Sequence, residues 1–260
     1  MSMSYSDIPP RIRIEDVTVG YGGHPVQSGI DADIGAGEIF AIVGDSGSGK
    51  STLMKAMIGL LQPQSGRILI EARPDGMPRD GAPDFGVLFQ GGALWTSMSV
   101  FDNVMLPMEL HGYAEPGARS ALARFKLALV GLSGAEASYP ASLSGGMRKR
   151  AALARALALD PSVLFLDEPS AGLDPLSSRR LDELISSLRA GLGITVVLVT
   201  HELESLFSVA DRMLFLDGET HRPIALGPPA ELARAAQSAK VREFLARSGV
   251  ESKPEVGAAT

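Results

Sequence analysis

The chain has 260 residues, of which 45% are hydrophobic and 21% charged, and this length and composition allow one large domain with an ample core. Its formal net charge of −6 argues against a surface built to bind nucleic acid, and the lack of cysteine excludes disulfide bonds and thiolate metal sites. The polar first ten residues do not resemble a signal peptide, and no apolar run approaches the ~20 residues of a membrane helix. We therefore expect any membrane role to come through a partner.

The N-terminal part predicts antiparallel strands. Residues 11–19 alternate polar and apolar side chains, which is typical of a strand with one face in water. Two further strands are expected at 26–35 and 38–43. Tyr21 follows the first strand between glycines that leave its ring exposed, so it could stack on an adenine. Taken alone, a tyrosine beside a turn is more often a surface or core residue than a ligand contact.

The stretch around which the rest of the chain is organised follows the strand 38–43. It is a glycine-rich loop that ends in Lys-Ser, and Thr52 behind it opens a helix, an order that fits G-x-x-x-x-G-K-[ST], the P-loop. The loop residues are Gly44, Asp45, Ser46, Gly47, Ser48, Gly49, Lys50 and Ser51. Glycines let successive N–H groups point at phosphate oxygens, and the helix N-terminus adds partial positive charge. We expect Lys50 to reach the β- and γ-phosphates of a nucleotide and the Ser51 hydroxyl to hold Mg²⁺.

A helical region is expected within the strand-rich core. The strand 85–89 runs into Gln90, and the Ala/Leu-rich composition that follows predicts a helical subdomain over about 92–160. Inside it, a second glycine-rich turn opens a helix and offers a second anion site. This turn comprises Ser144, Gly145 and Gly146. The Arg and Lys side chains of the helix that follows are expected on a solvated face rather than in a nucleic-acid patch.

Polar side chains follow two more of the expected strands. The fully apolar strand 163–166 is typical of the buried centre of a parallel sheet and ends in Asp167 and Glu168, while the strand 194–199 is followed by His201. In parallel α/β sheets ligands bind at the carboxyl ends of the strands. The P-loop, Gln90 and these three residues should therefore converge on one edge of the sheet.

The fold class predicted from this order is α/β. We expect a P-loop NTPase core with a mixed sheet, antiparallel in its N-terminal strands, and an inserted α-helical subdomain. One nucleotide-binding domain should span 1–260, with the helical subdomain at 92–160 and a C-terminal helix and tail at 230–260. An amphipathic pattern predicts that this terminal helix runs from about 230 to 247.

These residue types permit hydrolysis of a nucleoside triphosphate. Asp167 can hold Mg²⁺ directly or through water, together with Ser51, and Glu168 beside it could polarise an attacking water as a general base. The amide oxygen of Gln90 can reach Mg²⁺ and the water, and His201 could donate a hydrogen bond to the γ-phosphate. The alternative for the two acidic residues, a helix cap or an ion pair, is disfavoured because the same chain carries a P-loop.

The second glycine-rich turn cannot serve the same nucleotide within one chain. The helix behind it spans ~20 Å at about 1.5 Å per residue and points away from the sheet edge. Two phosphate cradles per chain therefore suggest two chains arranged head to tail, with each P-loop facing the Ser144 turn of the other chain. We expect ATP to hold this symmetric dimer together and hydrolysis to release it.

Taken together, these motifs resemble the ATPase subunit of an ABC transporter, over nearly all of residues 11–230. The elements of that family stand here as the adenine-stacking Tyr21, the Walker A loop, the Q-loop Gln90, the signature 143–147, the Walker B strand with Asp167 and Glu168, the D-loop Asp174 and the switch His201. The resemblance implies ATP and Mg²⁺ as cofactors and hydrolysis in a closed homodimer. It also implies transmission to a membrane-embedded permease through the helical subdomain.

A finer resemblance concerns the cargo. Met147 stands where many importers have Gln, and the runs 144–156, 89–94 with 100–104, and 241–245 are similar to those of Mla/Mce-type lipid transport ATPases. This implies phospholipid transport between membranes, an Mce-domain lipid-binding partner, and a place on the cytoplasmic face of a bacterial inner membrane. The permease would contact residues 91–116, and the C-terminal helix and tail would pack on the opposite subunit.

Several side chains in 91–116 are apolar enough to line a groove for the permease, although they could equally fill the core of the subdomain. They are Trp95, Met98, Phe101, Met105 and Met108.

Three alternatives differ from this interpretation. An ABC importer of amino acids or another small polar solute would share every catalytic residue. A soluble ABC protein acting on DNA or the ribosome usually has two cassettes or a long coiled-coil insertion, and this acidic chain has neither. The hypothesis of a P-loop GTPase or small-molecule kinase leaves the 143–147 signature unexplained, and the sequence has no Asn-Lys-x-Asp stretch to bind guanine.

Overall fold

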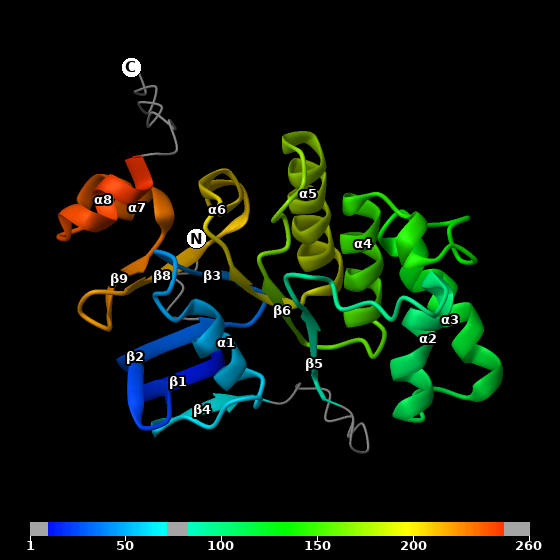
Figure 1. Cartoon of the computed structure of the whole chain (residues 1–260), viewed down its shortest axis with the longest axis horizontal. Helices are drawn as coiled ribbons and strands as arrows, with labels where there is room; N and C mark the ends of the chain where they lie inside the picture. The colour runs from blue at the N-terminus through cyan, green and yellow to red at the C-terminus, as the bar shows by residue number, and fades with distance from the viewer. Residues whose placement is uncertain (1–9, 72–82, 247–260) are drawn as a thin grey trace, which may run out of the picture.

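The computed structural model describes residues 10–71 and 83–246, which form two β-sheets with a helix between them and further helices on the larger sheet (Figure 1). The smaller sheet has the order β2-β1-β4 and is antiparallel throughout. The larger sheet has the order β5-β6-β7-β3-β8-β9, and only β9 runs antiparallel to its neighbour. The predicted α/β class is confirmed, with the antiparallel N-terminal strands in a sheet of their own.

The strands are β1 (Pro10–Tyr21), β2 (His24–Gly35), β3 (Ile39–Gly44), β4 (Ser65–Ile70), β5 (Phe85–Leu88), β6 (Val163–Asp167), β7 (Thr195–Val199), β8 (Arg212–Asp217) and β9 (Arg222–Gly227). Every residue of β3, β6 and β7 is buried. These three strands are neighbours at the centre of the larger sheet, which explains why their sequences are continuously apolar rather than alternating. Their carboxyl ends therefore lie together.

Helix α1 (Lys50–Met57) lies between the two sheets. Its apolar side chains, Leu53 and Met54 among them, share one buried cluster with Ile12 of β1 and with Phe40 of β3. The helix therefore has core on two sides, and its N-terminus is held directly behind the loop that follows β3. This arrangement fixes the P-loop between a buried strand and a buried helix.

Helices α2 (Val100–Leu110), α3 (Pro116–Leu129) and α4 (Gly145–Ala156) form a group at one end of the molecule (Figure 1). Their core is continuous with side chains of β6, β7 and α5 (Pro175–Leu192). Asn103 in α2 is fully buried and holds the preceding turn, because its side chain bonds to both the N–H and the C=O of Trp95. The helical group is thus packed firmly on the larger sheet, and the turn before α2 is fixed to it.

The C-terminal part forms two helices, α7 (Pro229–Ala235) and α8 (Ala239–Ala246), rather than the single helix expected from about 230 to 247. Ala236, Val241 and Leu245 are all buried in one cluster. In an unbroken helix Ala236 would face almost opposite to Val241, because five residues turn the helix by about 500°. The break between the helices brings both to the same core. The expected tail at 248–260 lies outside the described residues.

Candidate active site

The carboxyl edge of the larger sheet contains a cavity of about 780 Å³. Residues of the 44–52 loop line it together with Gln90, Glu168 and His201, and Val26 and Phe244 add apolar walls. The convergence predicted from the strand ends is therefore present for the P-loop, Gln90, Glu168 and His201, and Asp167 joins them through its hydrogen bond from Ser51. Phe244 belongs to α8 and was not anticipated from the sequence, because no local pattern links that helix to the P-loop.

The backbone of the P-loop requires glycine where it touches strand β8. Gly44 has φ of 144°, and a Cβ placed there would lie 2.2 Å from the carbonyl oxygen of Leu216. Gly49, with φ of 92°, is the N-cap residue of α1, and no side chain accepts a hydrogen bond at this cap. The first N–H groups of α1 therefore remain directed at the cavity, as an anion site requires.

Lys50 places its ammonium group over this loop. The side chain is largely buried, and Nζ donates to the carbonyl oxygens of Gly44 and Asp45, both at 2.8 Å. Burial lowers the pKa of Lys50, and the carboxylates of Glu168, Asp45 and Asp167 oppose that shift. A cation held in this way beside unpaired helix N–H groups suits a polyphosphate.

Ser51 and Asp167 bring a hydroxyl and a carboxylate together at the end of β6. Ser51 Oγ donates to Asp167 Oδ1 at 3.3 Å. Burial raises the pKa of Asp167, while the hydrogen bond from Ser51 lowers it. Hard oxygen donors of these two kinds fit Mg²⁺, which is usually bound by one or two protein oxygens together with phosphate oxygens and water. The residues present thus fit the expected cation, and Gln90 lines the same cavity.

Glu168 is held in a defined position opposite the P-loop. Its Oε2 atom lies 2.5 Å from Nδ1 of His201, and its N–H donates to the carbonyl oxygen of Val199 at 2.9 Å. Glu168 also has φ of 50°, a left-handed conformation that costs energy for a residue with a side chain. The side chain of Glu168 is 13% exposed and that of His201 is 60% exposed. The pair therefore places a carboxylate inside the cavity with the imidazole at its rim.

The basic run of α4 does not form the expected solvated face. Lys149 is 7% exposed, and its Nζ donates to the backbone oxygens of Gln90 at 2.5 Å and of Glu168 at 3.0 Å. Arg155 similarly donates to the backbone oxygens of Gly92 and Ala93. Only Arg148 of the run is exposed, and it too donates to a backbone oxygen, at 2.7 Å. The helix therefore ties the Q-loop and the end of β6 to the helical group.

A signal for the position of Lys149 was present in the sequence. Ala152, Leu153 and Ala156 are buried, and they stand three, four and seven residues after Lys149 on the same helix. This spacing puts the lysine on the apolar face. A cation on such a face has to find partners inside the protein.

The remaining candidate residues lie away from the cavity within one chain. Tyr21 is 51% exposed at the tip of the β1–β2 hairpin and is not among the residues lining the cavity, although Val26 of the same hairpin is. Ser144 caps α4 by accepting from the N–H of Met147 at 3.2 Å, and Asp174 caps α5 by accepting from Ser177 at 3.0 Å. Neither lines the cavity, nor do Gly145 and Gly146.

The sequence also matches a known protein family. A sequence model described as ABC transporter matches residues 28–171. The chain belongs to the ABC transporter family. The family and the site together support ATP hydrolysis, and the chain is an ABC-type ATPase.

Three relatives illustrate the range of names among similar proteins. The chain is 37% identical to "Probable ribonucleotide transport ATP-binding protein mkl" of Mycobacterium leprae, over 90% of this chain and 68% of that protein. It is 36% identical to "Intermembrane phospholipid transport system ATP-binding protein MlaF" of Haemophilus influenzae, over 90% and 89%. It is 41% identical to "Methionine import ATP-binding protein MetN" of Mesorhizobium japonicum, over 79% and 58%. The chain thus spans only part of the mkl and MetN relatives.

Solved structures agree with this assignment. A dimeric ATP-binding cassette in a post-hydrolysis state, bound to ADP and Pi, superimposes with a TM-score of 0.71 at 26% identity, covering 84% of this chain and 98% of that one. Within residues 10–71 and 83–246, no helix combines the length and the apolar character needed to span a membrane.

Proposed function

We propose that this chain powers a transporter that moves phospholipid between membranes. The match to MlaF, which extends over 89% of that protein, supports this cargo, as do the sequence runs that resemble Mla/Mce-type ATPases. The ATPase role itself is carried by one observation. Lys50, Glu168 and His201 line a single cavity at the edge of a parallel sheet, and Ser51 there bonds to Asp167.

The residues expected to bind and hydrolyse ATP have distinct proposed roles. The P-loop and Lys50 hold the phosphates of ATP, with Ser46, Gly47 and Ser48 contributing to the cradle and Thr52 to the start of α1. Ser51, Asp167 and Gln90 hold Mg²⁺, which would neutralise charge on the phosphate oxygens when bound. Because a catalytic base must lie within hydrogen-bond reach of its proton, the position of Glu168 suits acceptance of a proton from the attacking water. His201 orients the carboxylate of Glu168 and can also donate to the γ-phosphate.

A second chain completes the site in this proposal. The Ser144 turn and Asp174 lie outside the P-loop cavity of their own chain, so they are free to face the nucleotide of a partner copy in a head-to-tail homodimer. The dimeric cassette with bound ADP and Pi supports this arrangement. Tyr21, 51% exposed at its hairpin tip, is the residue proposed to stack on the adenine ring.

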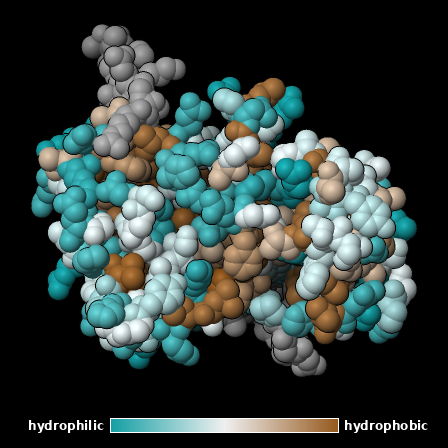
Figure 2. Space-filling model, in the orientation of Figure 1, coloured by the Kyte–Doolittle hydropathy of each residue, from teal (hydrophilic) through white to brown (hydrophobic). Residues whose placement is uncertain are grey.

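The helical group is the proposed contact for the permease, through residues 91–116. Trp95 and Leu110 are 57% and 73% exposed, and Figure 2 shows hydrophobic side chains over α2. Met108 is fully buried, so it fills the subdomain core and cannot line a docking groove. Phe101 and Met105 are half-buried and pack against the same core. An Mce-domain lipid-binding protein is the further partner proposed, and the permease would hold the chain at the cytoplasmic face of the inner membrane.

Import of a small solute is a second candidate, because MetN is 41% identical over 79% of this chain. The proteins and lipids that bind this chain in its host distinguish the two candidate functions. The tagged chain is captured from gently solubilised membranes, and the bound proteins and lipids are identified by mass spectrometry. A multispanning permease with an Mce-domain protein and phospholipid supports lipid transport. A solute-binding protein with a different permease refutes it and supports import, and a capture without any membrane protein refutes both.

A further inference from the structure

Helix α8 reaches the P-loop cavity although it lies almost 200 residues further along the chain. Phe244 lines the cavity, and its ring packs edge-on against Phe215 of β8 with centroids 5.0 Å apart. Val241 and Leu245 are buried beneath the helix. The helix is therefore seated firmly on the strand whose end borders the P-loop.

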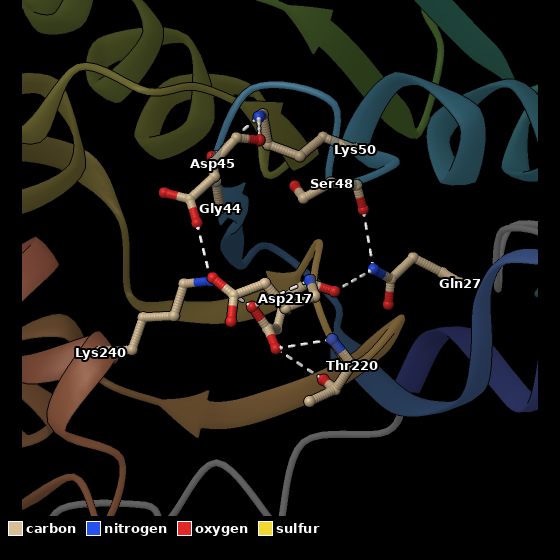
Figure 3. A network of polar contacts seen from close by, with 9 residues as sticks. Gln27, Gly44, Asp45, Ser48, Lys50, Asp217, Thr220 and Lys240 are labelled. Carbon is tan, nitrogen blue, oxygen red and sulfur yellow. Dashed lines mark hydrogen bonds and ion pairs between the residues drawn. The ribbon is translucent and has the colours of Figure 1, made fainter.

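The same helix directs a cation at the P-loop (Figure 3). Lys240 Nζ lies 3.1 Å from Asp45 Oδ2, 2.5 Å from Asp217 Oδ1 and 3.1 Å from Glu219 Oε1. The carboxylate of Asp217 is fixed in turn, because Thr220 donates to Oδ2 from its N–H at 3.0 Å and from its hydroxyl at 2.7 Å. The Lys240 ammonium thus forms ion pairs with three carboxylates. Two of them belong to Asp217, at the end of β8, and to Glu219, in the turn that follows.

The turn after β8 is also joined to the back of the P-loop. Gln27 is fully buried, and its Nε2 donates to the carbonyl oxygens of Ser48 at 2.9 Å and of Asp217 at 2.7 Å (Figure 3). Gly44 of the P-loop rests on the carbonyl oxygen of Leu216, as described above. The P-loop, the end of β8 and helix α8 therefore form one connected polar framework, and Asp217 is its common member.

The charges in this framework affect how tightly an anionic ligand binds. Asp45 lines the cavity that receives the phosphates of ATP, so its negative charge opposes ligand binding unless it is compensated. The hydrogen bond from Lys240 holds the pKa of Asp217 well below its usual range, and the same carboxylate raises the pKa of Lys240. Both groups are therefore ionised at neutral pH, and Lys240 forms an ion pair with the carboxylate of Asp45, whereas Lys50 donates to the backbone oxygen of that residue. The Lys240 side chain is 31% exposed, so solvent weakens these ion pairs without abolishing them.

We propose that Lys240 is a positioning residue of the nucleotide site, which anchors and neutralises Asp45 and thereby couples the seating of helix α8 to the affinity for ATP. The residue acts through the P-loop and does not touch the nucleotide. The coupling is reciprocal, so bound ATP also holds α8 more firmly against β8. The proposal rests on ATP binding at the P-loop and is independent of the cargo.

The test measures the Kd of ATP with Mg²⁺ by calorimetry on the full chain. Replacing Lys240 by Met should weaken binding about fivefold, the upper end for loss of a partly exposed ion pair, while Lys240→Arg stays within about twofold of wild type. The matched control is Arg234→Met, which removes the same charge from the exposed surface of α7. On an Asp45→Asn background, where no charge needs compensation, Lys240→Met should cost less than about threefold.

Two results would overturn the proposal. One is an ATP Kd within twofold of wild type for folded Lys240→Met, and the other is an equal loss on the wild-type and Asp45→Asn backgrounds. Thermal unfolding identifies any variant that does not fold. If Lys240→Met does not fold, the Asp45→Asn variant tests the proposal by itself. It should bind ATP at least as tightly as wild type, and weaker binding would refute the role given to Asp45. In hydrogen exchange, ATP should protect 239–246 in wild type and not in the double variant, and equal protection in both would also refute the coupling.

Discussion

Replacing Lys149 by Met should separate catalysis from nucleotide binding. The ammonium of Lys149 donates to the backbone oxygens of Gln90 and Glu168, and Met fills the same space without a donor. Each hydrogen bond from a charged donor is worth about 1.5–3 kcal/mol, and part of this is offset because a buried cation is removed. We therefore expect the free energy of unfolding to fall by about 2–4 kcal/mol.

The catalytic effect should exceed the effect on binding. With its carbonyl released, Glu168 loses one of the contacts that fix it at the end of β6. A displacement of about 1 Å at a catalytic group can cost roughly 100-fold in rate. We expect kcat for ATP hydrolysis to fall about 10- to 100-fold while KM for ATP changes by less than about threefold, because Lys50 and the P-loop are untouched.

The control for this experiment is Lys126→Met. Lys126 is a second buried lysine, 2% exposed, and its ion pair with Asp160 joins α3 to the loop after α4. This variant should lose comparable stability without losing kcat at a temperature where it is folded. If Lys149→Met kept its kcat, or if Lys126→Met lost as much, the positioning role of Lys149 would be wrong. ATP turnover of the variants is measured in the complex captured with its permease.

Three shorter predictions concern other parts of the chain. Burial raises the pKa of Asp182 to about 6, so the native state binds this proton more tightly than the unfolded chain does. Stability should therefore fall by up to about 3 kcal/mol as pH rises from about 4 to about 7, and change little from this cause above that. Urea unfolding should show that Asp182→Asn flattens this dependence, and an unchanged profile would contradict the cause. Replacing Gly44 by Ala should abolish ATP binding in calorimetry, because its Cβ would meet the carbonyl oxygen of Leu216, and retained binding would refute the steric argument. Joint replacement of Trp95 and Phe101 by Ala should remove co-purification of the permease with ATP binding intact, and retained co-purification would place the contact elsewhere.

The sequence was sufficient to predict the part of the site that lies at the ends of strands. The P-loop, Asp167, Glu168 and His201 each follow a recognisable strand, and the geometry of a parallel sheet brings such ends together without further information. Their convergence at one edge of the sheet was predictable for this reason, and so was the α/β class.

The contacts that support these residues were not predictable. Lys149 was expected in solvent. Its spacing on the helix indicates a buried position, but that spacing does not identify its partners, two loops that lie 59 and 19 residues away. Lys240 and Phe244 reach the P-loop only because the chain breaks between α7 and α8, and Gln27 meets Asp217 across 190 residues. Such contacts depend on tertiary packing, which neither periodicity nor local spacing encodes.

The most direct test of the central claim is ATP hydrolysis by the Glu168→Gln variant, measured in the captured complex alongside its affinity for ATP. If Glu168 is the base in an ABC-type site, turnover should fall by about 100-fold or more, while the Kd of ATP stays within about threefold and the variant accumulates as an ATP-bound dimer in gel filtration. Turnover at the wild-type rate would contradict the assignment of this cavity as the site of hydrolysis.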